Sequence, residues 1–151
     1  MPTFNSATYA AQIDGNPRNR IDASVMSAEV RFTEIEYKIL GTEASGDILK
    51  LVQLQNGVIV YPEQSLVISE GIGGTGVTLT AIGDQAKANR YSASAVALTA
   101  AGVVPLTVVA ADRAAPVKTD STNNVIQTTL GGTLPATVGK KFWLKLAYRI
   151  S

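Results

Sequence analysis

Residues 140–150 show the most regular alternation of hydrophobic and polar side chains in the sequence. Successive side chains of a β-strand point to opposite faces, so a period of two predicts a strand with one buried face. The sequence therefore predicts a strand here that contributes one face to the core. Its core-facing residues are Phe142, Leu144, Leu146, Tyr148 and Ile150, and its outward-facing residues are Trp143, Lys145, Ala147 and Arg149.

A similar alternation runs from residue 29 to residue 40, but its phase changes by one residue. The hydrophobic positions are Val30, Phe32, Ile35, Tyr37 and Ile39. A phase change of one residue within a strand predicts a β-bulge, which we place near Thr33 and Glu34.

Residues 47–54 are apolar on both faces apart from two polar positions, which predicts a central strand covered on both sides. Asn56-Gly57 follows directly, and residues 58–61 again favour a strand. An Asn-Gly dipeptide between two strands is typical of a tight β-hairpin.

Gly71, Gly73 and Gly76 have the spacing G-x-G-x-x-G of a dinucleotide-binding loop. That loop works when a helix follows it, because the helix N-terminus holds the pyrophosphate. Here residues 65–69 and 77–82 both favour strands, and the acidic residue expected about 20 positions later is missing. The glycines therefore predict a hairpin loop within a meander, where they supply positive φ.

About eight strands with turn residues between them and no convincing amphipathic helix predict an all-β fold. We expect residues 29–151 to form an antiparallel β-sandwich of jelly-roll type. Residues 1–28 lack a sustained period, which predicts an extended N-terminal arm or, alternatively, an unattached tail. In the arm, Phe4, Tyr9, Arg18 and Arg20 are candidate contacts with a partner.

Composition excludes several classes of chemistry. With 13 Lys and Arg against 12 Asp and Glu, the formal net charge is +1, so neither nucleic acid nor a membrane is expected as a partner. The sequence has no Cys and no His, which removes disulfides, Ser-His-Asp and Cys-His nucleophiles and typical zinc sites. It also shows no secretory signal and no apolar run long enough to span a membrane.

Three sets of residues are candidate sites. Glu34 and Glu36 share one face of a strand. Two interpretations are open: a glycosidase pair or, more simply, a charge ladder with Lys38. Asp84 is expected to cap a turn rather than to bind Ca²⁺, because no calcium-binding loop surrounds it. Trp143, outward beside Lys145 and Arg149, suits sugar stacking or subunit contact, unless a loop of its own subunit covers it. No catalytic, cofactor or metal residues are predicted.

Several segments together resemble the head decoration, or cement, proteins of tailed bacteriophages. The resemblance covers roughly residues 46–101 and the closing strand. It is carried by Asp47–Gly57, Ser65–Ile68, Leu79–Asp84 with its "IGD" turn, Ala88–Tyr91 with its "Arg-Tyr" pair, and Lys140–Ile150.

The resemblance implies a jelly-roll or related β-sandwich that assembles as a homotrimer. It implies binding to the major capsid protein at three-fold and quasi-three-fold positions of the shell, after synthesis in the host cytoplasm. The family has no catalytic residues, and the candidate contacts become Glu34, Glu36, Trp143, Arg149 and the four arm residues. Two alternatives stay open: a receptor- or glycan-binding head-fibre or tail protein that stacks sugar on Trp143 or Tyr91, and an enzyme that uses Glu34 and Glu36.

Overall fold

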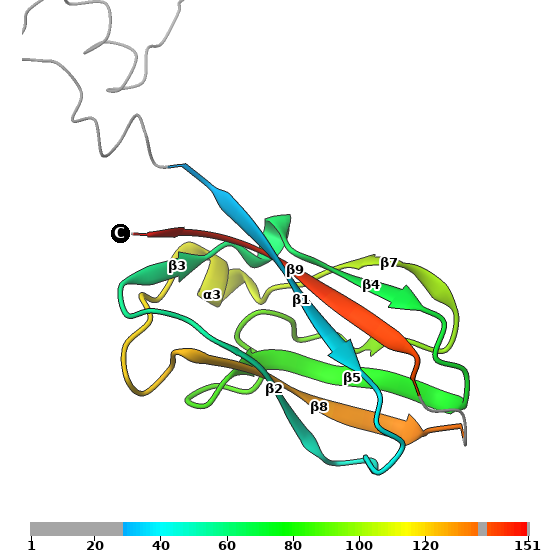
Figure 1. Ribbon diagram of the computed structural model, residues 1–151. Helices are drawn as coiled ribbons and strands as arrows, with labels where there is room; N and C mark the ends of the chain where they lie inside the picture. Colours follow the sequence, from blue (N-terminus) through cyan, green and yellow to red (C-terminus); the bar gives the residue numbers. More distant parts are fainter. Residues whose placement is uncertain (1–28, 136–138, 151) are drawn as a thin grey trace, which may run out of the picture.

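Two antiparallel sheets pack face to face in the computed structural model, which describes residues 29–135 and 139–150 (Figure 1). One sheet, here the β1–β7 sheet, has the order β1-β9-β4-β7, with β3 also paired to β9. The other, the β2–β6 sheet, has the order β2-β8-β5-β6. The elements are β1 (Arg31–Lys38), β2 (Ile48–Gln53), β3 (Val58–Val60), η2 (Pro62–Gln64), β4 (Leu66–Glu70), β5 (Thr75–Asp84), β6 (Val96–Ala97), β7 (Ala101–Pro105), α3 (Ala110–Ala114), β8 (Val125–Thr133) and β9 (Lys141–Ile150).

The strand pairs are nested in sequence: the first strand pairs with the last, and the following pairs lie progressively closer to the middle of the sequence. β1 pairs with β9, β2 with β8, β4 with β7 and β5 with β6, all antiparallel. Pairing of β4 with β9 and of β5 with β8 then joins these pairs into two sheets. The predicted antiparallel β-sandwich is confirmed, and we interpret the nested order as that of a jelly roll.

The alternation in β9 correctly predicts most of its core residues. Phe142, Leu144 and Leu146 are fully buried, and the ring of Phe142 stacks on Tyr37 with centroids 5.4 Å apart. The phase prediction is wrong at the end of the strand. Ala147 is fully buried beside the segment that contains Tyr61 and Ser65. Its N–H donates to Ser65 Oγ, and its C=O accepts from the Tyr61 N–H. Ile150, the last residue of β9, is exposed.

The predicted bulge in β1 is wrong. Its register with β9 is uninterrupted from Arg31, opposite Tyr148, to Lys38, opposite Lys141. Phe32 instead points outward and is 53% exposed. The Lys145 ammonium lies 5.4 Å from the centre of its ring, a cation–π contact that stabilises the outward position.

The predicted central strand, β2, is in fact at an edge and pairs with β8 alone. Its register shifts between Lys50 and Val52, and Ile48 is 59% exposed. The Asn56-Gly57 turn is also no hairpin, because β2 and β3 belong to different sheets. Gly57 has a φ of 85°, and its N–H donates to the Thr119 carbonyl.

The glycine-rich segment is a connection between two strands, as predicted, but not a hairpin within a meander. It joins β4 of one sheet to β5 of the other. Gly74 has a φ of 79°, and a Cβ there would lie 2.3 Å from the Thr133 carbonyl oxygen, so a side chain is excluded. The loop is thus shaped by close backbone packing.

The connection from β7 to β8 contains the short helix α3, which the sequence did not predict. Within residues 29–135 and 139–150, no helix is long and apolar enough to cross a membrane.

Candidate functional site

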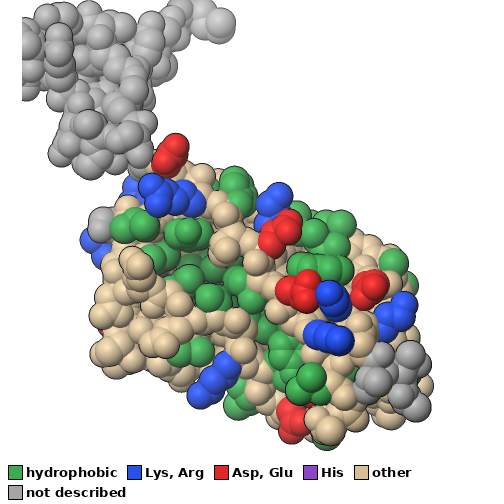
Figure 2. Space-filling view, in the orientation of Figure 1, with side chains coloured by type: hydrophobic (Ala, Val, Ile, Leu, Met, Phe, Trp, Pro, Cys, Tyr) green, Lys and Arg blue, Asp and Glu red, His purple; other side chains and the backbone are tan. Residues whose placement is uncertain are grey.

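Charged side chains form a cross-strand ladder on the outer face of the β1–β7 sheet. Glu34 lies opposite Lys145, and Glu36 lies opposite Trp143. Glu36 accepts hydrogen bonds from Lys141 Nζ at 3.0 Å and from Trp143 Nε1 at 3.3 Å. Figure 2 shows acidic and basic side chains next to one another over β1 and β9. The structure therefore brings Glu34, Glu36 and Trp143 together, as a ladder rather than as a cleft.

The electrostatics of this face oppose acid catalysis by Glu36. The hydrogen bond from the Lys141 ammonium lowers the pKa of Glu36, with smaller contributions from Trp143 Nε1 and the charge of Lys38. A glycosidase acid needs a raised pKa and a second carboxylate across a substrate cleft. Glu34 instead lies two residues away on the same exposed strand face. This geometry gives no support to an enzyme that uses the pair.

A row of apolar side chains crosses the same face beside the ladder. Trp143 is opposite Ile68 of β4, and Ile68 is opposite Val103 of β7. Trp143 is half-buried, whereas Val103 is 58% exposed. Because residues directly opposite each other share a face, the row forms one continuous strip. An apolar strip beside charged groups is the composition of a protein-binding surface, with tryptophan as its strongest anchor.

The remaining predicted contacts are not part of this strip. Arg149 lies further along β9, half-buried and opposite Ile59 of β3. Its Nε is buried without a hydrogen-bond partner among the described residues. The four arm positions, Phe4, Tyr9, Arg18 and Arg20, lie outside the described residues.

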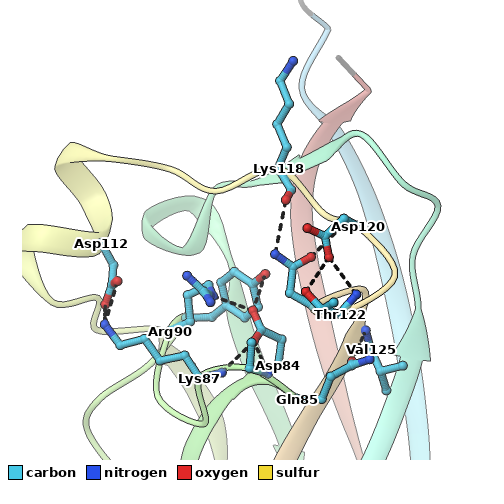
Figure 3. A network of polar contacts seen from close by, with 12 residues as sticks. Asp84, Gln85, Lys87, Arg90, Asp112, Lys118, Asp120, Thr122 and Val125 are labelled. Atoms are coloured by element: carbon cyan, nitrogen blue, oxygen red, sulfur yellow. Dashed lines mark hydrogen bonds and ion pairs between the residues drawn. The ribbon is translucent and has the colours of Figure 1, made fainter.

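Asp84 holds the turn after β5, as its sequence context predicts (Figure 3). Its Oδ1 accepts from the N–H groups of Ala86 at 2.9 Å and Lys87 at 2.8 Å, and its Oδ2 accepts from Arg90 and from the Tyr91 hydroxyl. The carboxylate is fully buried. Burial, followed by the charge of Asp84, raises the pKa of Tyr91 well above its usual range. The cluster is a structural support for this loop.

The buried position of Tyr91 removes it as a platform for sugar stacking. Only 4% of its surface is exposed. It lines a pocket of about 50 Å³ together with Pro62 of η2, Arg113 of α3 and Pro116. Ligand pockets usually measure about 300–1,000 Å³, so this one is much smaller than a usual ligand site. Sequence reasoning missed it because α3 was not predicted.

Lys87 links this cluster to α3 through an ion pair with Asp112 at 2.7 Å. A neighbouring turn repeats the capping chemistry, since Asp120 Oδ1 accepts from the N–H and hydroxyl of Thr122. Within the described part of the chain, no three His, Cys, Asp or Glu residues are grouped to hold a metal ion.

No protein-family model and no curated protein matches the sequence. Solved structures of phage capsids are among those that share the fold. A chain of the cyanophage Pam1 capsid asymmetric unit matches with a TM-score of 0.55 and 16% identity, over 100% of both chains. A chain of the capsid of Ralstonia phage GP4 matches with a TM-score of 0.52 and 19% identity, over 82% of this chain and 85% of that one. At these identities the likeness shows a common fold.

Proposed function

We propose that this chain is a non-enzymatic structural protein of a tailed-phage virion, a decoration or cement protein that binds the major capsid protein shell. The observation that carries the proposal is the match of the whole chain to a chain of the Pam1 capsid. The match to a GP4 capsid chain supports it independently. The sequence resemblance to head decoration proteins points to the same role.

The surface supports a macromolecular partner rather than a small substrate. The apolar strip of Trp143, Ile68 and Val103 is flanked by the Glu34–Glu36 ladder. A capsid subunit offers a broad surface of the kind that such a strip fits, because binding energy concentrates at a few apolar anchors surrounded by polar groups. We assign this face to the contact with the shell.

Stabilisation of the shell follows from preferential binding. A protein that binds the assembled shell and not its free subunits shifts the equilibrium toward assembly by mass action. A homotrimer at a three-fold or quasi-three-fold position has three linked contacts, and avidity then makes weak individual contacts sufficient. The protein would be made in the host cytoplasm and finish on the outside of the virion.

The test uses heads of the cognate phage assembled without this protein. Cosedimentation measures binding, and the temperature of DNA release measures shell stability. We expect saturable binding and a higher release temperature with the wild-type protein. Failure of the wild-type protein to bind these heads refutes the cement function.

Two matched variants test the assigned face. Val103→Glu places a charge in the apolar strip, and Ile48→Glu places one at an equally exposed site of the β2–β6 sheet, since the two residues are 58% and 59% exposed. We expect Val103→Glu to weaken binding at least about tenfold, because a partner would have to bury an unpaired charge. Ile48→Glu should bind as the wild type does. Equal binding by the two variants contradicts the assignment of the face.

A further inference from the structure

The two strand orders end in four edge strands, and three of them carry features that hinder further pairing; β3, which lies off these orders, is bridged to Lys118 on its other side. β6 has only two residues, β2 has a shifted register, and β7 has five residues and ends at Pro105. Natural sheets protect their edges with such short, bulged or proline-containing strands. β1 is different: its eight residues are in unbroken register with β9 and contain neither Pro nor Gly.

The open edge of β1 presents a regular row of backbone groups. Ile39 N–H donates to the Lys140 carbonyl, which fixes the odd-numbered residues of β1 as those bonded to β9. The N–H and C=O groups of Phe32, Glu34, Glu36 and Lys38 therefore point away from β9. In the part of the chain that the structure describes, no strand pairs with this edge. The row is a template for one added strand.

The charges on β1 exclude a second β1 strand as that partner. Only even-numbered residues present their backbone groups to the open edge, so even positions must pair with even positions. Antiparallel pairing of two β1 strands over most of their length then puts Glu34 opposite another Glu34 or opposite Glu36. Like charges directly opposite each other destabilise a strand pair. The added strand should instead carry two basic residues at alternate positions.

The sequence contains one segment that meets this requirement. Glu34 and Glu36 are the only two acidic residues spaced two apart, and Arg18 and Arg20 are the only two basic residues with that spacing. Antiparallel pairing of Arg20 with Glu34 and Arg18 with Glu36 places all four side chains on the outer face. The preceding residue, Pro17, then has its nitrogen on the new outer edge, where a missing N–H costs no hydrogen bond and blocks a further strand.

We propose that residues 17–21 of one copy add a strand to the open edge of β1 in a neighbouring copy. The inference rests on the trimer of the proposed function. Figure 1 shows β1 beginning at the outer end of the sandwich. The residues between Arg20 and Arg31 span up to about 35 Å when extended. A head-to-tail contact of this kind closes into a ring when a three-fold axis relates the copies.

The added strand also covers apolar surface. Ile35 and Tyr37 are only partly buried, although they pack against the core from the inner face of β1. Figure 2 shows hydrophobic side chains on the face in view, in the region between β1 and β2. In the proposed register Ile21 lies opposite Thr33 and Asn19 lies opposite Ile35, so the arm shields these partly buried side chains from water. Within residues 29–135 and 139–150, no strand covers this edge or these two side chains.

The first test is cysteine crosslinking, for which the chain is suited because it contains no Cys. The double variant Arg20→Cys/Glu34→Cys is treated with a short bifunctional thiol reagent and run on a denaturing gel. We expect covalent dimers and trimers. The matched control Arg20→Cys/Lys50→Cys moves the second cysteine to the edge strand β2, and the single-cysteine variants report random collisions; neither should give trimers. A link confined to the monomer, or no link, overturns the proposal.

The second test is charge exchange, read out as native mass in solution. Arg18→Glu/Arg20→Glu should raise the concentration at which the trimer dissociates at least about tenfold, and adding Glu34→Arg/Glu36→Arg should restore assembly. Absence of rescue in a quadruple variant that unfolds at the wild-type midpoint refutes the pairing.

These results separate the inference from the cement function. Binding of the wild-type protein to heads, with no crosslinked trimers from Arg20→Cys/Glu34→Cys, keeps the cement function and overturns the strand exchange. Crosslinked trimers from that variant, with no binding of the wild-type protein to heads, keep the strand exchange and refute the cement function.

Discussion

Replacing Asp84 with alanine tests the role assigned to the buried cluster after β5. Alanine removes the carboxylate that caps the N–H groups of Ala86 and Lys87 and pairs with Arg90. The Asp84 side chain is fully buried and that of Arg90 is only 14% exposed. Loss of one partner of a buried pair costs about 3–5 kcal/mol, and loss of a side-chain cap alone costs about 1 kcal/mol. Because Arg90 retains some access to water, we expect a total of about 3–5 kcal/mol.

The variant Asp84→Asn separates the cap from the charge. Its amide oxygen still accepts from Ala86 and Lys87, while the ion pair with Arg90 becomes a neutral contact. We expect a loss of about 1–3 kcal/mol, between the wild type and Asp84→Ala. Asp120→Ala is the matched control, because that carboxylate makes a similar turn with Thr122 in an exposed position. It should destabilise less than either Asp84 variant.

Urea denaturation measures these differences as shifts of the midpoint at constant slope. Domains of this size are stable by about 5–15 kcal/mol, so Asp84→Ala should unfold at a much lower urea concentration. A loss below about 1 kcal/mol for Asp84→Ala, or equal losses for Asp84→Ala and Asp120→Ala, would refute the structural role of the buried cluster.

Three further predictions concern the core, pH and glycans. Leu144→Ala should cost about 2–5 kcal/mol, since the side chain is fully buried, and the outward Lys145→Ala about 0.5 kcal/mol or less; the reverse order in denaturation would overturn the phase of β9. Partial burial opposes ionisation of Glu43, but hydrogen bonds from backbone N–H groups and a tyrosine hydroxyl outweigh it and lower its pKa. The stabilisation by ionised Glu43 is thus present above the pKa that this group has in the unfolded chain, and it is lost as pH falls through the pKa in the folded protein. Glu43→Gln should therefore destabilise the protein at pH 7 and approach the stability of the wild type in unfolding experiments in acid. On a glycan array we expect no saturable binding; binding abolished by Trp143→Ala would favour the sugar-binding alternative.

Local sequence signals predicted those features that depend on few neighbours. The alternation in β9 identifies Phe142, Leu144 and Leu146 as core, because one face of that strand meets the opposing sheet. The cap of Asp84 follows from the preference of aspartate for turns and needs only the next few residues. Such features are determined within a short stretch of chain.

The sheet to which each strand belongs could not be predicted, because the composition of a strand does not determine which strand pairs with it. β2 is apolar on both faces yet lies at an edge, and the Asn56-Gly57 turn serves equally to change sheets. In β1, hydrophobicity placed Phe32 inside, but Lys145 from the distant strand β9 stabilises it outside. These outcomes depend on residues far apart in sequence, as do the open edge of β1 and the apolar strip.

The two proposed contacts lie on different parts of one sheet, and this predicts opposite responses in two assays. Val103→Glu alters the apolar strip, remote from the open edge of β1, and should leave the native mass unchanged while head binding falls. Arg18→Glu/Arg20→Glu leaves the strip intact but removes the linkage of three copies. Its monomer should bind heads through one contact, and loss of avidity weakens binding by about 10²–10⁴-fold. A covalently linked trimer of the second variant should regain most of that affinity, whereas linking Val103→Glu should restore little. If linkage rescues both equally, the strip is not the surface that contacts the shell.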